Sequence, residues 1–397
     1  MSGRWWLRAD AVVDVVAGRP VPGADAVEIR DGRIARIGAV PAHPDGPVRE
    51  LPGHVLTPGL VSCHAHLSVV YPFTAIDPAE PSALTALRAA ARAEQALNAG
   101  VTTLRCVHEQ HGVDLVLRRA AAAGWVRAPR IVGAGRALSV TGGHGAGFGS
   151  LEVDGPEAFL AAARHELRAG ADHLKVFLTG GIAAPGENLD EPQMTDDELT
   201  AVLAAAAAHN APVVAHAASA GPIRRGLAAG IRSFEHGYRI DPDTARLMAE
   251  AGAVLGPTLC VTRLPEWMRA NGFTEWQVER ALAAGPAHLE SVRTAVAAGV
   301  RVVNSTDYPP GAPVGDSTVV ATELGFLVEA GLTPAEALRA STVGGAELLR
   351  VVDKCGSLDP GKAADVLAVD GDPLEDPAAM GRVAAVVQAG VPVRGCA

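Results

Sequence analysis

Cysteine is scarce in this chain. The five cysteines are odd in number, widely spaced and free of CxxC pairs, at Cys63, Cys106, Cys260, Cys355 and Cys396. Disulfide frameworks normally use an even number of closely spaced cysteines, so this pattern argues against one and against a structural zinc knuckle. We therefore expect a protein of the reducing cytoplasm.

Long apolar runs are also missing. The N-terminal segment MSGRWWLRAD holds no apolar stretch of signal-peptide length. No later segment approaches the roughly 18 to 20 apolar residues that a membrane-spanning helix requires. The sequence thus predicts a soluble protein with no membrane partner.

Basic charge and nucleotide-binding loops are likewise lacking. The 34 Lys and Arg are outnumbered by 44 Asp and Glu, for a net charge of −10, and the acidic residues are scattered along helical segments. This balance argues against a nucleic-acid partner and is explained by solubility. Neither GxGxxG after a strand nor the GKS/T ending of a P-loop occurs. The sequence therefore predicts neither a nucleic-acid partner nor a nucleotide-cradling loop.

The central part of the sequence alternates short β-branched runs with Ala-rich stretches of helical length. This pattern is typical of a parallel sheet covered by helices. Eight strand candidates can be counted: VLTPGLVSCHAH, VTTLRCV, PRIVGAG, DHLKVFL, APVVAHA, SFEHG, GAVLGPT and RVVNSTD. A regular run of eight favours a closed (β/α)8 TIM barrel over an open sheet, and we place this barrel at residues 57–354.

The two ends of the chain read differently. WWLRADAVVDVV and AVEIRDGRIARIG near the N-terminus, and ADVLAVD and AAVVQAGVPV near the C-terminus, are short strand-like segments separated by turn residues. We expect residues 1–56 and 355–397 to pair into one small composite β-sandwich domain.

A His-x-His pair ends the first barrel strand. His64 and His66 are two residues apart, so their side chains leave the same face of a strand and can bind one metal. The motif alone is weak in a chain with 13 histidines. Whether His64 and His66 bind a metal therefore depends on the residues at the ends of the other strands.

Four further metal-competent groups lie on other barrel strands. Lys175 lies inside an apolar run, where an ammonium group must be paired or chemically altered. His216, His236 and Asp307 each close a strand-like segment. Singly, they could be an ion-paired lysine, hydrogen-bonded core histidines and a capping aspartate. Together they would share the carboxyl-end mouth of the barrel, where active sites of this fold are built.

At this point the sequence resembles the amidohydrolase superfamily over nearly its whole length. The segments that carry the resemblance are TPGLVSCHAHLS, ALSVTGGHGAGFG, GADHLKVFLTGGIAAP, VVAHAASAGPIRRGLAAGIRSFEHG, VVNSTD and GSLDPGKAADVLAVDGDPL. The likeness is greatest to the prolidase-like branch, whose members include dipeptidases and enzymes that cleave N-acyl amino acids. The resemblance implies a hydrolase of an amide-type bond.

The resemblance also implies a centre of two divalent metal ions, with zinc as the first candidate. Lys175 would be carboxylated by CO2 and would bridge the metals. His64, His66 and Asp307 would complete one site, and His216 and His236 the other. A water held between two such ions loses its proton near neutral pH and can attack the substrate carbonyl. Asp307 is then the expected general base and acid.

Several loop residues are expected at the same mouth. His144 lies in the glycine-rich loop VTGGHGAGFG, and by resemblance it contacts the scissile carbonyl or a substrate carboxylate. Tyr238, Arg263 and Tyr308 follow other strands, and Arg263 could grip a carboxylate with its guanidinium group. Ala218 stands where similar dipeptidases tend to have a tyrosine, which leaves room for a bulkier or less peptide-like amide.

Other functions remain open on sequence alone. A mononuclear deaminase or an imidazolone-type ring hydrolase of the same superfamily would leave Lys175 without a role, and the glutamate that deaminases show soon after the strand-five histidine is missing after His216. Lactonase, esterase or phosphotriesterase activity is chemically open to a two-metal hydroxide. A non-catalytic scaffold would have lost metal ligands, which this chain keeps. Assembly of copies through the barrel faces is also open.

Overall fold

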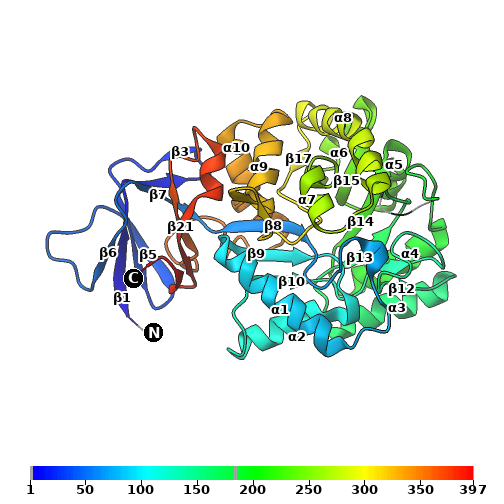
Figure 1. The fold of residues 1–397 in the computed structure, drawn as a ribbon, viewed down its shortest axis with the longest axis horizontal. Helices are drawn as coiled ribbons and strands as arrows, with labels where there is room; N and C mark the ends of the chain where they lie inside the picture. The colour runs from blue at the N-terminus through cyan, green and yellow to red at the C-terminus, as the bar shows by residue number, and fades with distance from the viewer. Residues whose placement is uncertain (1–2, 183, 185, 397) are drawn as a thin grey trace.

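The computed structural model describes residues 3–182, 184 and 186–396. A larger α/β part and a smaller β module lie side by side, and the described residues begin and end in the β module (Figure 1). No helix within the described residues is both long enough and apolar enough to cross a bilayer. The α/β class expected from the alternating pattern is confirmed.

Parallel strands form the centre of the larger part. One sheet has the order β10-β9-β8 and the other the order β12-β11-β13-β14-β15-β16-β17. Their bounds are β8 (Leu60–Ala65), β9 (Val101–Cys106), β10 (Arg130–Gly133), β11 (Leu138–Ser139), β12 (Leu151–Glu152), β13 (Leu174–Phe177), β14 (Val213–Ser219), β15 (Ser233–Arg239), β16 (Val254–Gly256) and β17 (Arg301–Val302).

The two sheets are connected at both edges. On one side β10 and β11 belong to a single stretch of chain that Gly135, with φ of 69°, interrupts. On the other side the backbone N–H of Cys63 donates to the carbonyl of Asn304 over 2.8 Å. The parallel strands thus form two sheets where the sequence predicts one closed sheet. The hydrogen-bonded ladder between neighbouring strands is interrupted at Gly135 and ends at the short strand β17.

Helices cover the outside of these strands (Figure 1). They are α1 (Ser82–Asn98), α2 (Val113–Ala122), α3 (Pro156–Ala169), α4 (Asp196–Ala208), α5 (Ala220–Ala229), α6 (Pro242–Glu250), α7 (Pro265–Ala270), α8 (Glu275–Ala297), α9 (Val319–Glu329), α10 (Pro334–Ala340) and α11 (Val343–Leu348). Thr195 and Glu198 form a capping box that starts α4, and Gly170 ends α3 in the left-handed conformation. Short 3-10 turns are η1 (Phe73–Ala75), η2 (Gln110–Gly112), η3 (Leu259–Thr262) and η4 (Pro377–Gly381).

The β module contains two sheets. The first has the order β5-β4-β1-β6 and the second the order β22-β21-β20-β7-β2-β3. Their strands are β1 (Arg4–Arg8), β2 (Ala11–Asp14), β3 (Arg19–Pro20), β4 (Ala26–Arg30), β5 (Arg33–Gly38), β6 (Val48–Glu50), β7 (His54–Pro58), β20 (Val366–Asp370), β21 (Val383–Gln388) and β22 (Val391–Arg394). Outside these two sheets, β18 (Pro313–Val314) and β19 (Ser317–Thr318) form a two-stranded hairpin between β17 and α9. Since β7 pairs with β20, segments from the two ends of the chain share one sheet.

The six-stranded sheet is buried on both faces. In β20, Val366 and Ala368 belong to the apolar core between the two sheets of the β module, whereas Leu367 and Val369 belong to the large core of the α/β part. Successive strand residues point to opposite faces, so this sheet packs against the first sheet with one face and against the α/β part with the other. The continuous apolar run in ADVLAVD follows from this double burial.

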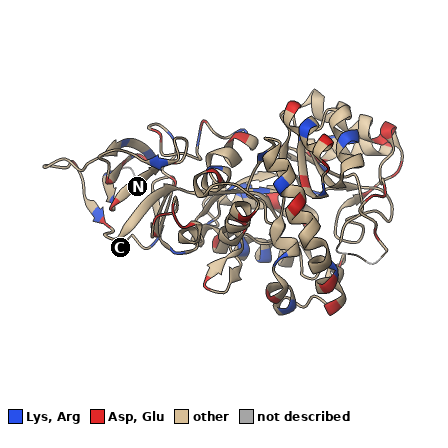
Figure 2. Cartoon of the chain, turned by 90° about the horizontal axis from the view of Figure 1, so that it is seen from above, with Lys and Arg blue, Asp and Glu red and all other residues tan. Residues whose placement is uncertain are grey.

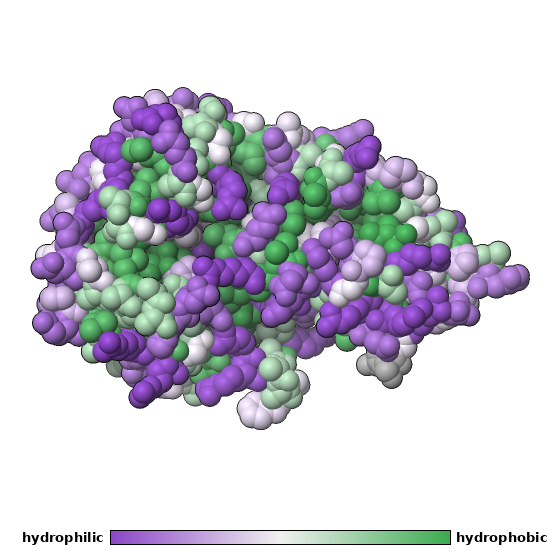
Figure 3. All heavy atoms as spheres, turned by 180° about the vertical axis from the view of Figure 1, so that it is seen from behind, coloured by the Kyte–Doolittle hydropathy of each residue, from purple (hydrophilic) through white to green (hydrophobic). Residues whose placement is uncertain are grey.

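Charged residues are spread over both parts. Acidic and basic positions are interspersed over the outer helices and the β module (Figure 2). Seen from behind, the surface is mostly hydrophilic, with apolar side chains in the hollows between polar ones (Figure 3). The five cysteines are free thiols and are all buried.

Candidate metal centre

One cavity lies where the carboxyl ends of the parallel strands meet. Its empty space is about 800 Å³ when the solvent at its open mouth is included. Its lining includes all six of the groups that the sequence predicts as metal ligands: His64, His66, Lys175, His216, His236 and Asp307. The fold thus gathers residues that are up to 243 positions apart in the chain.

His64, His66 and Asp307 form a compact triad. The Nε2 atoms of His64 and His66 lie 3.0 and 3.1 Å from the same oxygen of Asp307, Oδ1. One ligand atom from each residue lies within 4.8 Å of the others, as the ligands of a single metal ion do. Burial opposes the charge of Asp307, but His64 and His66 outweigh it and hold the pKa of that carboxyl well below its usual range.

His216 and His236 stand beside the triad. Their ring centroids are 4.5 Å apart, and the ring of His236 lies 5.2 Å from that of His64. His236 Nδ1 is 2.7 Å from the hydroxyl of Thr258, and His216 Nε2 is 3.1 Å from the carbonyl of Gly180. Burial keeps the pKa of both imidazoles well below the usual value, so both are neutral bases near pH 7.

Lys175 reaches the same cavity from β13. Only 2% of the residue is exposed, and its Nζ makes no hydrogen bond to any residue that the structure describes. Burial lowers the pKa of this amine to about 8. A buried amine without a partner is costly, so this group requires a ligand or a chemical change.

Local backbone conformation turns two of these residues inward. His236 has φ of 69° and Asp307 has φ of 59°, both in the left-handed region that residues other than glycine rarely adopt. At His236 this conformation breaks the strand alternation, so that Glu235 and His236, although adjacent, both contact the site. Such strain is typical of functional positions.

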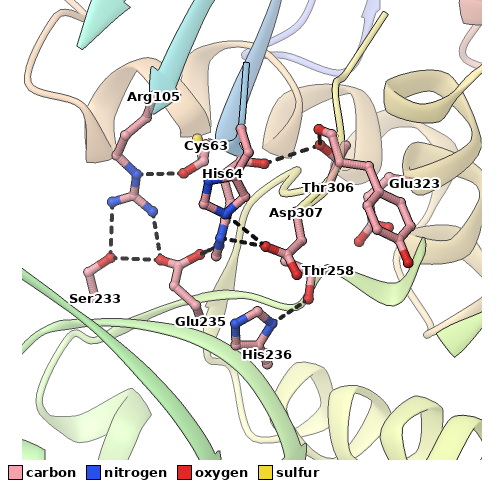
Figure 4. Close-up of polar contacts among 12 residues, drawn as sticks. Cys63, His64, Arg105, Ser233, Glu235, His236, Thr258, Thr306, Asp307 and Glu323 are labelled. Atoms are coloured by element: carbon pink, nitrogen blue, oxygen red, sulfur yellow. Dashed lines mark hydrogen bonds and ion pairs between the residues drawn. The ribbon is translucent and has the colours of Figure 1, made fainter. Parts of the chain in front are cut away.

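A buried ion pair supports the triad from behind (Figure 4). Glu235 Oε2 lies 2.7 Å from His64 Nδ1, and its other oxygen lies 2.6 Å from Arg105 Nη2. Burial opposes the charge of Glu235, but Arg105 and His64 bring the pKa of the carboxyl down to about 2. The carboxylate therefore fixes His64 with Nδ1–H toward Glu235 and Nε2 toward Asp307.

The sequence analysis missed this pair and one further lining residue, His108. The signals were present: Arg105 and Glu235 are charged residues within apolar strand candidates. His108 Nδ1 accepts from the N–H of Ala137 over 3.0 Å, and its Nε2 donates to the carbonyl of Phe148 over 2.9 Å. Burial lowers the pKa of His108 to about 3, so this ring is a neutral part of the wall.

Three of the four loop residues expected at the mouth line the cavity. His144 Nδ1 is 2.7 Å from Glu187 Oε2, and the His144 ring lies 4.2 Å from the His216 ring. Tyr238 stacks on His236 at 5.5 Å, and Tyr308 follows Asp307 directly. Arg263 is outside the lining, because its guanidinium group pairs with Glu329 and lies over the ring of Phe326.

The motifs and the geometry agree with one protein family. The model of the amidohydrolase family matches residues 55–393. The chain belongs to the amidohydrolase family. Ochratoxinase of Aspergillus niger is 30% identical over 394 residues, which cover 90% of this chain and 80% of that protein.

Two further amidohydrolases extend the comparison. Imidazolonepropionase of Micrococcus luteus is 28% identical over 379 residues, covering 87% of each chain. The crystal structure of a prolidase complexed with N-methylphosphonate-L-proline has a TM-score of 0.88 and 29% identity, covering 98% of this chain and 99% of that one. This amidohydrolase is thus a metal-dependent hydrolase of carbon–nitrogen bonds of the amide or peptide type.

Proposed function

We propose that this amidohydrolase binds two divalent metal ions, with zinc as the first candidate, and hydrolyses an amide, dipeptide or N-acyl amino acid. His64, His66 and Asp307 would hold one ion, and His216 and His236 the other, with a carboxylated Lys175 between them. The eight strands that the sequence predicts, which correspond to β8, β9, β10, β13, β14, β15, β16 and β17, would form a (β/α)8 barrel at residues 57–354. Residues 1–56 and 355–397 would form the composite β-sandwich domain.

The donor set fits such a centre. Each of the four imidazoles uses one ring nitrogen for a partner, namely Glu235, the carbonyl of His108, the carbonyl of Gly180 or the hydroxyl of Thr258. This leaves one lone pair on each ring for a cation, as second-shell hydrogen bonds do at metal sites. Neutral imidazoles and a carboxylate suit zinc better than magnesium or calcium.

The observation that carries the proposal is the state of Lys175. Its amine lies in the cavity beside the four imidazoles and Asp307, buried and without a hydrogen-bond partner among the described residues. A deprotonated amine reacts with CO2 to give a carbamate, which supplies two anionic oxygens where the structure has one unpaired nitrogen. A mononuclear deaminase or ring hydrolase gives Lys175 no comparable task.

When bound, the two ions supply an acidified water and polarise the substrate carbonyl. Asp307 then takes the proton of the attacking water and passes it to the leaving nitrogen, because its carboxylate is the only one in the described lining of the cavity. His144, held by Glu187, contacts the carbonyl side of the substrate. Glu235 keeps His64 in the required tautomer.

Release of a free amine tests this function. The protein should be purified without chelators and incubated with dipeptides, N-acyl amino acids and simple aryl amides. We expect amine release that stops after dialysis against a strong chelator and returns with added zinc. Cleavage of lactones or esters alone, with no amine from any amide, would contradict the proposal. The free, buried cysteines fit a location in the reducing cytoplasm. The proposed partner is a small-molecule amide substrate. Assembly into homo-oligomers is left open.

A further inference from the structure

Aromatic side chains are concentrated around the candidate metal centre. The whole chain has only seven Phe, three Tyr and five Trp, which is 4% of its residues. Six of them line this one cavity: Phe73, Phe148, Phe177, Tyr238, Phe273 and Tyr308. They lie near the ends of strands β8, β11, β13, β15, β16 and β17 or in the loops that follow, so six different strands contribute a ring to the lining.

The rings form two organised walls. On one side Phe73 and Phe148 lie with ring centroids 5.5 Å apart, and Phe73 meets the edge of His66 at 6.3 Å. On the other side Tyr308 stacks on Trp267 at 4.2 Å. Rings braced in this way keep a fixed apolar surface for a flat or bulky group.

The remaining walls are mostly apolar, and the polar residues Gln277, His108 and His144 complete them. Val69, Ile182, Val261, Met268 and Ala281 complete much of the lining. Ala218 is fully buried in the same apolar cluster as Tyr238 and Tyr308. A substrate must therefore bring apolar surface to this cavity in order to replace the contacts with water.

Cations are lacking where a substrate carboxylate would need one. Lys175 is the only Lys or Arg among the lining residues that the structure describes, and the proposed metal centre uses it. His144 faces Glu187, so any positive charge on that ring is already balanced. His108 uses both ring nitrogens for backbone groups.

The arginines near the mouth are committed elsewhere. Arg92 donates to the carbonyls of Leu67 and Val69. Arg280 donates to the carbonyl of Glu187 over 2.7 Å and to that of Ala184 over 2.9 Å. Arg263 pairs with Glu329. Among the described lining residues, a free carboxylate of the substrate would thus find neutral donors such as the hydroxyls of Tyr238 and Tyr308 but no unpaired cation, and burying a charge without one is costly.

We infer that the substrate of this cavity is an uncharged amide with an aromatic or similarly bulky apolar group, and that it has no free carboxylate next to the scissile bond. Simple aryl or arylalkyl amides, and acyl amino acids with a blocked carboxyl group, belong to this class. Dipeptides and N-acyl amino acids with a free carboxyl end do not. The inference rests on the proposed amide hydrolysis and narrows its substrate.

Two compounds that differ in one group test the inference on the zinc-loaded wild-type protein. N-benzoyl-phenylalanine and N-phenethylbenzamide have the same benzoyl group and the same phenethyl skeleton on the amide nitrogen, but only the first carries a carboxylate on that skeleton, next to the scissile bond. We expect kcat/KM for amine release to be at least about tenfold higher for N-phenethylbenzamide, because N-benzoyl-phenylalanine must bury its carboxylate without a cation beside it. Equal rates, or a preference for the acid, would overturn the inference and leave the amide hydrolase intact.

A third compound and one variant make the outcome specific. N-phenethylacetamide, which lacks the aromatic acyl group, should be cleaved more slowly than the benzamide if the rings hold that group. Met268→Lys places a cation in the wall and should shift the ratio of the two rates toward the acid, whereas Met268→Leu should keep the wild-type order. An unchanged ratio in a folded Met268→Lys protein would contradict the inference. Absence of amine from all three compounds and from dipeptides would contradict the proposed function itself.

Discussion

Glu235 holds His64 through a hydrogen bond of 2.7 Å and is itself held by Arg105 at 2.6 Å, in a pair that is almost completely buried. His64 Nε2 therefore points at Asp307 in a fixed orientation (Figure 4). The relationship makes Glu235 a positioning residue for the candidate metal centre, although it does not itself line the cavity.

The first prediction concerns this carboxylate. Glu235→Gln removes the charge that fixes the His64 tautomer and leaves the charge of Arg105 uncompensated in the interior. We expect the affinity for zinc to fall by roughly 10- to 100-fold, as is typical for partners of metal-bound histidines. Competition with a zinc chelator of known affinity measures this. Glu329→Gln, which removes a carboxylate at the surface, is the matched control and should bind zinc like the wild type.

The second prediction concerns CO2. If Lys175 is carboxylated, protein stripped of metal should regain activity slowly with zinc in CO2-depleted buffer and faster when bicarbonate is added. The rate of reactivation is the measurement, and equal rates in both buffers would speak against the carbamate. The exposed Lys354 serves as a control, since Lys354→Ala should respond to bicarbonate like the wild type.

Asp307 is the subject of the third prediction. Asp307→Asn keeps the shape of the side chain but removes the proton acceptor, so we expect kcat to fall by roughly 10²- to 10⁴-fold while the folded structure persists. Turnover and thermal unfolding should be measured on the same preparation. Asp316→Asn, at an exposed position, should change neither. A loss of folding in step with activity would show a structural role instead.

The fourth prediction separates two residues that the sequence analysis grouped together. His144→Ala should raise KM or lower kcat of a confirmed substrate, because the ring lines the cavity beside His216. Arg263→Ala should leave both constants unchanged, because Arg263 pairs with Glu329 outside the cavity. Unchanged kinetics in His144→Ala would remove its contact role.

The sequence revealed residues whose type and position are both unusual. The sequence predicts one shared site because metal-binding groups rarely recur at the ends of so many strands. These groups are Lys175 within an apolar run and His216, His236 and Asp307 at strand ends. The α/β class was predictable for a similar reason, since alternating strand and helix patterns extend over many residues. The break at Gly135 was not, because it depends on one backbone conformation.

The parts that the sequence did not reveal depend on contacts across the fold. Arg105 and Glu235 are 130 positions apart, and no local pattern indicates that they pair. Arg263 was predicted to contact the substrate because it follows a barrel strand. The sequence does not indicate that Glu329 lies beside Arg263 and pairs with it. The aromatic walls likewise come from the ends of six different strands or from the loops after them, and their spacing in the sequence has no period.

Metal content per chain is the most direct test of the central claim. The wild type and Lys175→Ala should be prepared in parallel without chelators, supplied with zinc and analysed by elemental mass spectrometry, with circular dichroism to show that both are folded. The account predicts about two ions per wild-type chain and a clear loss of metal in folded Lys175→Ala, together with the loss of amine release. About one ion per chain in the wild type, or two ions and full activity in Lys175→Ala, would contradict the binuclear centre.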